Sequence, residues 1–182
     1  GPKALSNMLP ELTTKTSDPI FIVQHMPPKF TESLAKSLDK KCEHTVIEAK
    51  NNDLVQNNYA YIAPGGRHLL LRKGAGDEVF TYITDQPPEN GCRPSVDILF
   101  RSAATVYGGD AIAIVLTGMG SDGAKGLAPL VRKGVHVMVQ DEKTSVVWGM
   151  PGSAVAAGCV DDVLPLQDIP KAVESVIKRK KG

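Results

Sequence analysis

The sequence has few cysteines, few aromatic residues and no long apolar run. Its three cysteines, Cys42, Cys92 and Cys159, are an odd number and form no C-x-x-C pair, which argues against a disulfide framework and a cysteine zinc site. We therefore expect reduced thiols in a cytoplasmic protein. The longest apolar run, Ala111 to Leu116, is far shorter than the roughly 20 residues that span a bilayer, so we expect no insertion into a membrane.

Neither sign of charge is in excess. Lysine and arginine together number 21 and the acidic residues 20, which gives a net charge of +1. Proteins that bind nucleic acid usually carry a basic excess, so we expect no nucleic-acid partner. The length of 182 residues is enough for a single domain with a sizeable core.

Helix and strand patterns alternate along the chain. Apolar residues recur at helical spacing over 2–13, 31–38, 95–107, 124–133, 153–157 and 169–178, and strand-like runs occupy 20–23, 44–49, 112–116, 135–141 and 160–166. Strands that alternate with helices are typical of a parallel sheet covered on both faces. Three strand-like runs with short glycine turns between residues 59 and 85 predict an antiparallel excursion. The fold class predicted is α/β, one doubly wound domain over residues 1–182 with a mostly parallel sheet.

The segment from Gly118 to Gly123 matches the dinucleotide-binding pattern G-x-G-x-x-G, and Asp141 follows near the position of a ribose-binding acid. A nucleotide-dependent oxidoreductase of the Rossmann type is therefore one hypothesis. However, the carboxylate of Asp122 would repel a pyrophosphate at the helix N-terminus, and few strand–helix units follow the motif. A second interpretation is a tight turn in which Asp122 only caps the following helix. We expect no cofactor.

A second buried strand ends on a titratable side chain. His25 follows Ile20–Val23, and Pro27 and Pro28 stop the strand there. Ligand sites of open α/β sheets lie at the carboxyl ends of the strands, where Asp122 is also predicted. A histidine oriented by an aspartate is the base half of a hydrolase triad. No second histidine or cysteine lies at ligand spacing beside either residue, so no metal site is predicted, and the other three histidines receive no role.

Five segments then make the sequence recognisable: "QHMPPKFTESLAKSL", "YIAPGGRHL", "RPSVDILFRSAA", "LTGMGSDGAKGL" and "VVWGMPGSAVAAG". In this order they closely resemble successive motifs of the catalytic domain of CheB-type protein-glutamate methylesterases of bacterial chemotaxis. The resemblance extends from Gly1 to the C-terminal helix. It implies an α/β hydrolase domain with a Ser-His-Asp triad that hydrolyses glutamate methyl esters on chemoreceptors and, in many members, deamidates receptor glutamines.

The resemblance assigns roles to individual residues. His25 corresponds to the triad histidine, Asp122 to the triad aspartate, and Met119 to the residue whose backbone N–H binds the oxyanion. The implied partners are the cytoplasmic helices of methylated chemoreceptors and a receiver domain in the full-length protein. Further residues of these motifs are predicted to shape the site: Gln24, Arg93, Ser95, Thr117, Gly118, Gly120 and Met150. Ser95 as a helix N-cap and Met150 as a core residue are the alternative interpretations.

The sequence departs from the family at the nucleophile. In the family the serine lies in a Ser-Thr-Gly-Gly segment after a first strand, and Gly1–Leu5 aligns with the residues that directly follow it. We therefore expect the first strand and the serine to lie upstream of Gly1. Without that serine, residues 1–182 would form an inactive receptor-binding module. Ser6 is no substitute, since it falls in the second turn of a predicted helix.

Overall fold

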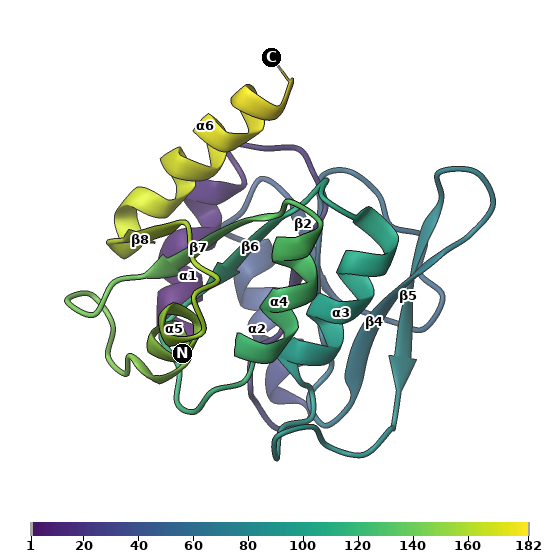
Figure 1. Ribbon diagram of the computed structural model, residues 1–182. Helices are drawn as coiled ribbons and strands as arrows, with labels where there is room; N and C mark the ends of the chain where they lie inside the picture. The colour runs from purple at the N-terminus through teal and green to yellow at the C-terminus, as the bar shows by residue number, and fades with distance from the viewer. Residues whose placement is uncertain (1, 182) are drawn as a thin grey trace.

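The computed structural model describes residues 2–181, in which helices and strands alternate as the sequence predicts (Figure 1). The helices are α1 (Pro2–Leu12), α2 (Phe30–Asp39), α3 (Val96–Tyr107), α4 (Ala124–Arg132), α5 (Gly149–Ala156) and α6 (Ile169–Lys181), with a 3-10 turn at Leu166–Asp168. The strands are β1 (Ile20–Ile22), β2 (Thr45–Glu48), β3 (Tyr59–Ile62), β4 (His68–Lys73), β5 (Val79–Thr84), β6 (Ile112–Val115), β7 (His136–Gln140) and β8 (Asp162–Leu164). None of the helices within residues 2–181 combines the length and the apolar character needed to cross a bilayer.

The parallel strands fall into two sheets. One three-stranded sheet has the order β1-β3-β2 and the other the order β6-β7-β8, and every pairing in both is parallel. The α/β class and the predominance of parallel strands are confirmed. Among the described residues, however, β1 and β6 are both edge strands, and no ladder joins the two sheets into one.

The antiparallel excursion is shorter than predicted. Strands β4 and β5 pair antiparallel from His68 opposite Thr84 to Lys73 opposite Val79. The sequence predicts the run Tyr59–Ile62 as part of the same excursion, but this run is strand β3 and pairs parallel with both β1 and β2. Periodicity alone could not separate the two cases, because a short apolar run fits either kind of sheet.

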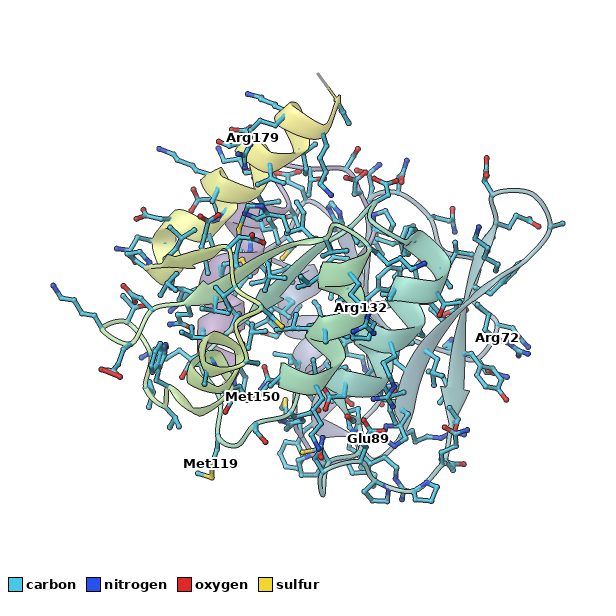
Figure 2. The ribbon with its side chains drawn as sticks, viewed as in Figure 1. Arg72, Glu89, Met119, Arg132, Met150 and Arg179 are labelled. Carbon is cyan, nitrogen blue, oxygen red and sulfur yellow. The ribbon has the colours of Figure 1, made fainter. Side chains whose placement is uncertain are left out.

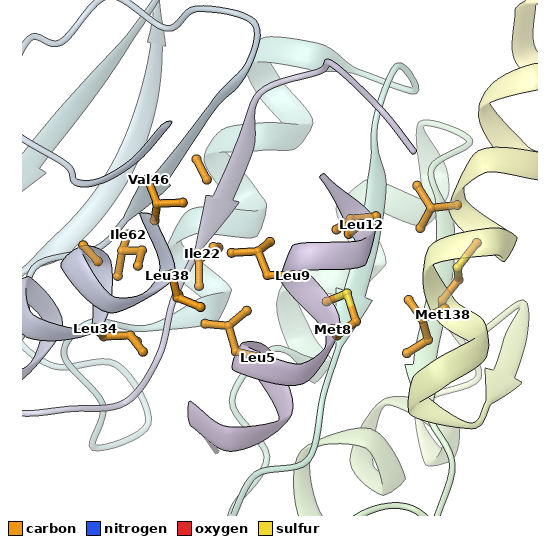
Figure 3. Packing of buried hydrophobic residues seen from close by; sticks show 14 of the residues in the cluster. Leu5, Met8, Leu9, Leu12, Ile22, Leu34, Leu38, Val46, Ile62 and Met138 are labelled. Atoms are coloured by element: carbon orange, nitrogen blue, oxygen red, sulfur yellow. The ribbon is translucent and has the colours of Figure 1, made fainter. Parts of the chain in front are cut away.

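The core on one side of the molecule is organised by α1. Its apolar residues lie at helical spacing and point into a cluster with α2 and the strands, which Figure 3 shows: Leu5, Met8, Leu9, Leu12, Ile22, Leu34, Leu38, Val46, Ile62 and Met138. Leu9 and Leu38 are fully buried. Full burial of a leucine side chain contributes about 1.5–3 kcal/mol, so α1 fixes the position of β1 and of the turn that follows it.

Helices α3 and α4 lie side by side (Figure 1) and approach closely. A Cβ atom on Gly126 of α4 would lie 2.8 Å from the Cα atom of Asp97 in α3. Glycine is therefore required for this approach. The contact brings the N-terminus of α3 next to the N-terminus of α4, at the end of β6.

Candidate active site

The two residues that the sequence placed at strand ends are in contact. His25 follows β1 and Asp122 lies in the loop after β6, and His25 Nε2 is 2.8 Å from Asp122 Oδ2. The predicted contact is confirmed. The histidine side chain is 30% exposed and the carboxylate only 1% exposed, so the imidazole lies between solvent and a buried anion.

A close backbone approach holds the turn that carries His25. A Cβ on Gly65 would lie 2.4 Å from the carbonyl carbon and oxygen of Pro27, so only glycine fits there. The Gly65 N–H also donates to the Thr31 hydroxyl, which in turn donates to Glu48 Oε2 at 2.6 Å. The turn after β1 is therefore packed against the turn after β3.

Asp122 accepts four hydrogen bonds. Its Oδ2 accepts from His25 and from the Val96 N–H at 2.7 Å, while Oδ1 accepts from the Ser95 hydroxyl at 2.9 Å and the Asp97 N–H at 3.1 Å. Burial alone would raise the pKa of this carboxyl, but the hydrogen bonds, led by that from His25, outweigh burial and lower the pKa below its usual range. Asp122 is thus ionised and fixed in orientation.

The N-termini of α3 and α4 are capped reciprocally. Asp122, at the start of α4, binds the first two amides of α3, and Asp97 of α3 accepts from the Gly123 N–H at 2.9 Å and the Gly126 N–H at 2.7 Å. The interpretation of Asp122 as a cap of its own following helix is therefore wrong. A carboxylate near a helix N-terminus is stabilised by free N–H groups and by the dipole, and here each helix supplies that acid to the other.

The pKa of Asp97 is shifted in the opposite direction to that of Asp122. Burial raises the pKa of Asp97, and the charge of Asp122 raises it further, against the hydrogen bonds from Gly126 and Gly123. Its second oxygen accepts from the Asn90 side-chain amide at 2.8 Å. The pKa values of the two neighbouring carboxyls are therefore shifted in opposite directions, and the carboxyl that contacts His25 ionises more readily.

Ser95 occupies the N-cap position of α3 without capping it. Its side chain makes no capping hydrogen bond, and the hydroxyl donates to Asp122 instead. The interpretation of Ser95 as a side-chain N-cap is therefore wrong, and its role in shaping the site stays a prediction.

The loop after β6 presents Met119 to solvent. Gly118 holds the loop through its N–H to the Val147 carbonyl at 3.0 Å and its carbonyl to the Met150 N–H at 2.9 Å. Gly120 has φ of 89°, a value that favours glycine. Met119 is 80% exposed, and its side chain points away from the protein (Figure 2). The backbone N–H of Met119 makes no hydrogen bond with any of residues 2–181.

Thr117 and Met150 hold this loop in place from its buried side. The Thr117 N–H donates to Gln140 Oε1 at 2.8 Å, and its hydroxyl donates to the Val147 carbonyl at 2.8 Å and accepts from the Val147 N–H. Met150 is only 8% exposed, and its sulfur would lie 2.7 Å from a Cβ on Gly118. Met150 is thus a buried residue, as its alternative interpretation had it.

The imidazole faces a cavity of about 340 Å³. Residues from three loops line it, among them His25, Pro28, Gly66, Cys92 and Arg93. The Arg93 guanidinium donates to the backbone carbonyls of Asp85 and Gln86 at 3.2 and 3.3 Å, so it braces the rim. Of the predicted site residues, only His25 and Arg93 line this cavity, and Gln24 is half-buried outside it.

Sequence reasoning missed Cys92. His25, Cys92 and Asp122 each place one potential ligand atom within 4.8 Å of the others. A metal ion would nevertheless have to displace hydrogen bonds from Asp122, because each carboxylate oxygen already accepts two. Burial raises the pKa of the Cys92 thiol, and the charge of Asp122 raises it further, which disfavours the thiolate that metals bind. No sequence signal links position 92 to position 25, since their proximity depends on the long loop before α3.

The geometry does not favour dinucleotide binding. A pyrophosphate would need free amides at the start of α4, but those of Gly123 and Gly126 donate to Asp97. The proposed ribose ligand, Asp141, accepts from the N–H and hydroxyl of Thr144 at 2.9 and 2.6 Å. The glycines of the motif instead serve the tight turn after β6, and Gly126 permits the close approach of α3 and α4.

Comparison with known proteins identifies the same family that the motifs indicated. A protein-glutamate methylesterase/protein-glutamine glutaminase of Desulfotalea psychrophila is 50% identical over 98% of this chain, and one of Trichodesmium erythraeum is 45% identical over 98%. The chain spans 49% and 50% of these relatives, about half their length. The crystal structure of the Thermotoga maritima CheB methylesterase catalytic domain superposes with a TM-score of 0.92 at 41% identity, covering 97% of this chain and 93% of that one.

The family model for CheB methylesterase matches residues 1–173. Together with the shared fold and the contact between His25 and Asp122, this match shows that the chain belongs to the CheB methylesterase family.

Proposed function

We propose that the protein hydrolyses glutamate methyl esters on bacterial chemoreceptors, with His25 as the general base and Asp122 as the residue that orients it. The observation that carries the proposal is the 2.8 Å contact between a solvent-facing imidazole and a buried, ionised carboxylate beside a cavity. Relatives of this chain are named for this activity. The same acyl-transfer chemistry would release ammonia from glutamine, in line with the second activity in those names.

The contact determines which nitrogen is available for catalysis. Nε2 donates to Asp122, so Nδ1 is the nitrogen that takes the proton from the nucleophile. The nucleophile attacks the ester carbonyl, and the resulting oxyanion accepts a hydrogen bond from the backbone N–H of Met119. The protonated His25 then gives its proton to the leaving methoxide, which departs as methanol. Water hydrolyses the acyl-enzyme by the same route and releases a glutamate carboxylate.

The nucleophile in this proposal is a serine in a segment that precedes α1. Strands β1 and β6 are the edges of their respective sheets, and His25 follows one while Met119 and Asp122 follow the other. A parallel strand between β1 and β6 would join the two sheets, and its carboxyl end would lie between His25 and Met119. That position suits the serine of the triad.

Release of methanol from methylated chemoreceptor tests the proposal, using the protein with its upstream residues. Replacing His25 by alanine should lower kcat by about 10⁴-fold, since the general base is removed. His136→Ala is a matched control, because His136 Nε2 also lies 2.6 Å from a carboxylate oxygen, that of Asp162, at the opposite end of the strands. Equal activity of the His25 variant and wild type would refute the triad.

A further inference from the structure

A second histidine lies behind the candidate active site, fully buried at the start of β4. The side chain of His68 is 0% exposed, and both ring nitrogens have a partner. Its Nδ1 lies 3.2 Å from the backbone nitrogen of Ser95, and its Nε2 lies 3.0 Å from the carbonyl oxygen of Pro87. No sequence motif assigns a role to this residue.

These two partners fix the protonation of the ring. The Ser95 N–H can only donate, so Nδ1 must be the unprotonated acceptor, and the Pro87 carbonyl can only accept, so Nε2 must carry the proton. An imidazolium would place an N–H at Nδ1 directly against the N–H of Ser95. His68 is therefore neutral, in a single tautomer.

His68 is connected to the candidate active site through one residue. The backbone of Ser95 is held by His68, while its hydroxyl donates to Asp122 Oδ1, and the next two backbone amides, Val96 and Asp97, donate to the same carboxylate. Three of the four donors to Asp122 thus come from a segment whose first N–H is anchored on His68.

We infer that His68 is a positioning residue for the His25–Asp122 pair, which it sets through the backbone of Ser95. The inference rests on the proposed function for its effect on turnover, and on the contacts alone for its effect on the pair. Loss of the acceptor at Nδ1 would free the Ser95 N–H, and the three donors would move relative to Asp122. The carboxylate would then hold the imidazole less well.

Two isosteric substitutions separate the two halves of the ring. In His68→Asn the amide oxygen replaces Nδ1 and keeps the acceptor for Ser95, whereas in His68→Gln the amide nitrogen replaces Nε2 and keeps only the donor to Pro87. We expect His68→Gln to lower kcat by on the order of ten- to hundred-fold with KM unchanged, since small misplacements of catalytic groups have such effects. His68→Asn should stay within a few-fold of wild type. Equal activity of the two variants, whether high or low, would overturn the inference.

Nuclear magnetic resonance of the protein gives a readout that does not need esterase activity. The proton between His25 and Asp122 should give a strongly deshielded signal that persists in His68→Asn and is lost or shifted in His68→Gln. If the wild-type protein showed no esterase activity while the NMR signals of both variants behaved as expected, the proposed function would be refuted and the positioning role would remain. An unchanged signal in His68→Gln would overturn the positioning role.

The wild-type protein provides a test even where a variant fails to fold. Nitrogen-15 correlation spectra of the imidazole distinguish the tautomers, and we expect His68 to be protonated at Nε2 only. A ring protonated at Nδ1, or at both nitrogens near neutral pH, would contradict the inference directly.

Discussion

At the scale of single residues, Asp122 combines two tasks that are often divided between residues. It orients the imidazole of His25, and it also binds the first amides of α3. The second task supports the first, because N–H donors stabilise the charge that the imidazole needs opposite it. A substitution here should therefore affect stability and activity together.

Asp122→Asn should lower kcat by about 10⁴-fold and destabilise the fold by roughly 2–4 kcal/mol. Asparagine keeps one acceptor oxygen, but its NH2 group replaces the other oxygen. That NH2 group would then face the hydrogen-bond donors that the replaced oxygen accepted from. Asp162→Asn is the control, since Asp162 contacts a histidine outside the site. Methanol release and urea unfolding measure the two effects. A variant with wild-type stability would show that the four hydrogen bonds contribute little.

The opposite pKa shifts of the two acids predict opposite pH effects on stability. The pKa of Asp122 is lowered in the folded state, so its contribution is full above the unfolded value of about 3.9 and is lost as pH falls through the folded value. The pKa of Asp97 is raised, so ionised Asp97 costs stability at neutral pH, and this cost disappears on acidification through that raised value.

Urea midpoints between pH 3 and pH 7 measure both contributions. Asp122→Asn should reduce the loss of stability that occurs as pH falls below about 4. Asp97→Asn should remove a gain in stability that occurs on acidification and begins at higher pH. If the two variants changed the pH profile in the same direction, the opposite shifts would be contradicted.

At the scale of elements, the site depends on how closely α3 and α4 pack. Gly126→Ala would place a methyl group 2.8 Å from the Cα of Asp97, against backbone that cannot rotate away. We expect a loss of about 1–3 kcal/mol in unfolding free energy and reduced activity, because the amides of α3 would move relative to Asp122. Lys125→Ala, at an exposed position of the same helix, is the control. Increased stability, as alanine's helix propensity alone would give, would refute the argument.

Elements and pair contacts differed in how far they could be predicted. Helices such as α1 and α3 were predicted closely, because their apolar spacing is regular. The contact of His25 with Asp122 followed from both residues being at strand ends. The direction of β3, the reciprocal caps and the proximity of Cys92 depend on which elements become neighbours. His68 was missed because a buried histidine in a strand carries no local signal.

At the scale of the whole molecule, charge is balanced but unevenly placed near the site. A cavity of about 390 Å³ adjoins the one that holds His25, since Pro28 lines both, and Lys29, Lys50 and Arg67 line it. Arg67 pairs with Asp85 at 2.7 Å. Glu48 also lines this cavity and Arg67 is paired, so the net positive charge of the lining comes from Lys29 and Lys50. Under the proposed function, acidic side chains beside the methyl ester would meet this charge.

Replacing Lys29 and Lys50 by glutamate should raise KM for methylated receptor several-fold and leave kcat unchanged, because like charges would then oppose the substrate. The rise in KM should shrink at high salt. Replacing Lys171 and Lys178, two exposed residues of α6, by glutamate changes the net charge by the same amount away from both cavities and is the control. An equal effect of this control pair would show that only net charge matters.

The reciprocal capping of α3 and α4 by Asp122 and Asp97 has a consequence for how the protein folds. Neither acid has its donors until both helices have docked, so the amides of Val96, Asp97, Gly123 and Gly126 should exchange their hydrogens with deuterium in one shared opening event. Separate exchange rates for the two helices would contradict this coupling. A partly folded chain then has no carboxylate held in place behind His25, so under the proposed function it would not hydrolyse esters until both helices have docked.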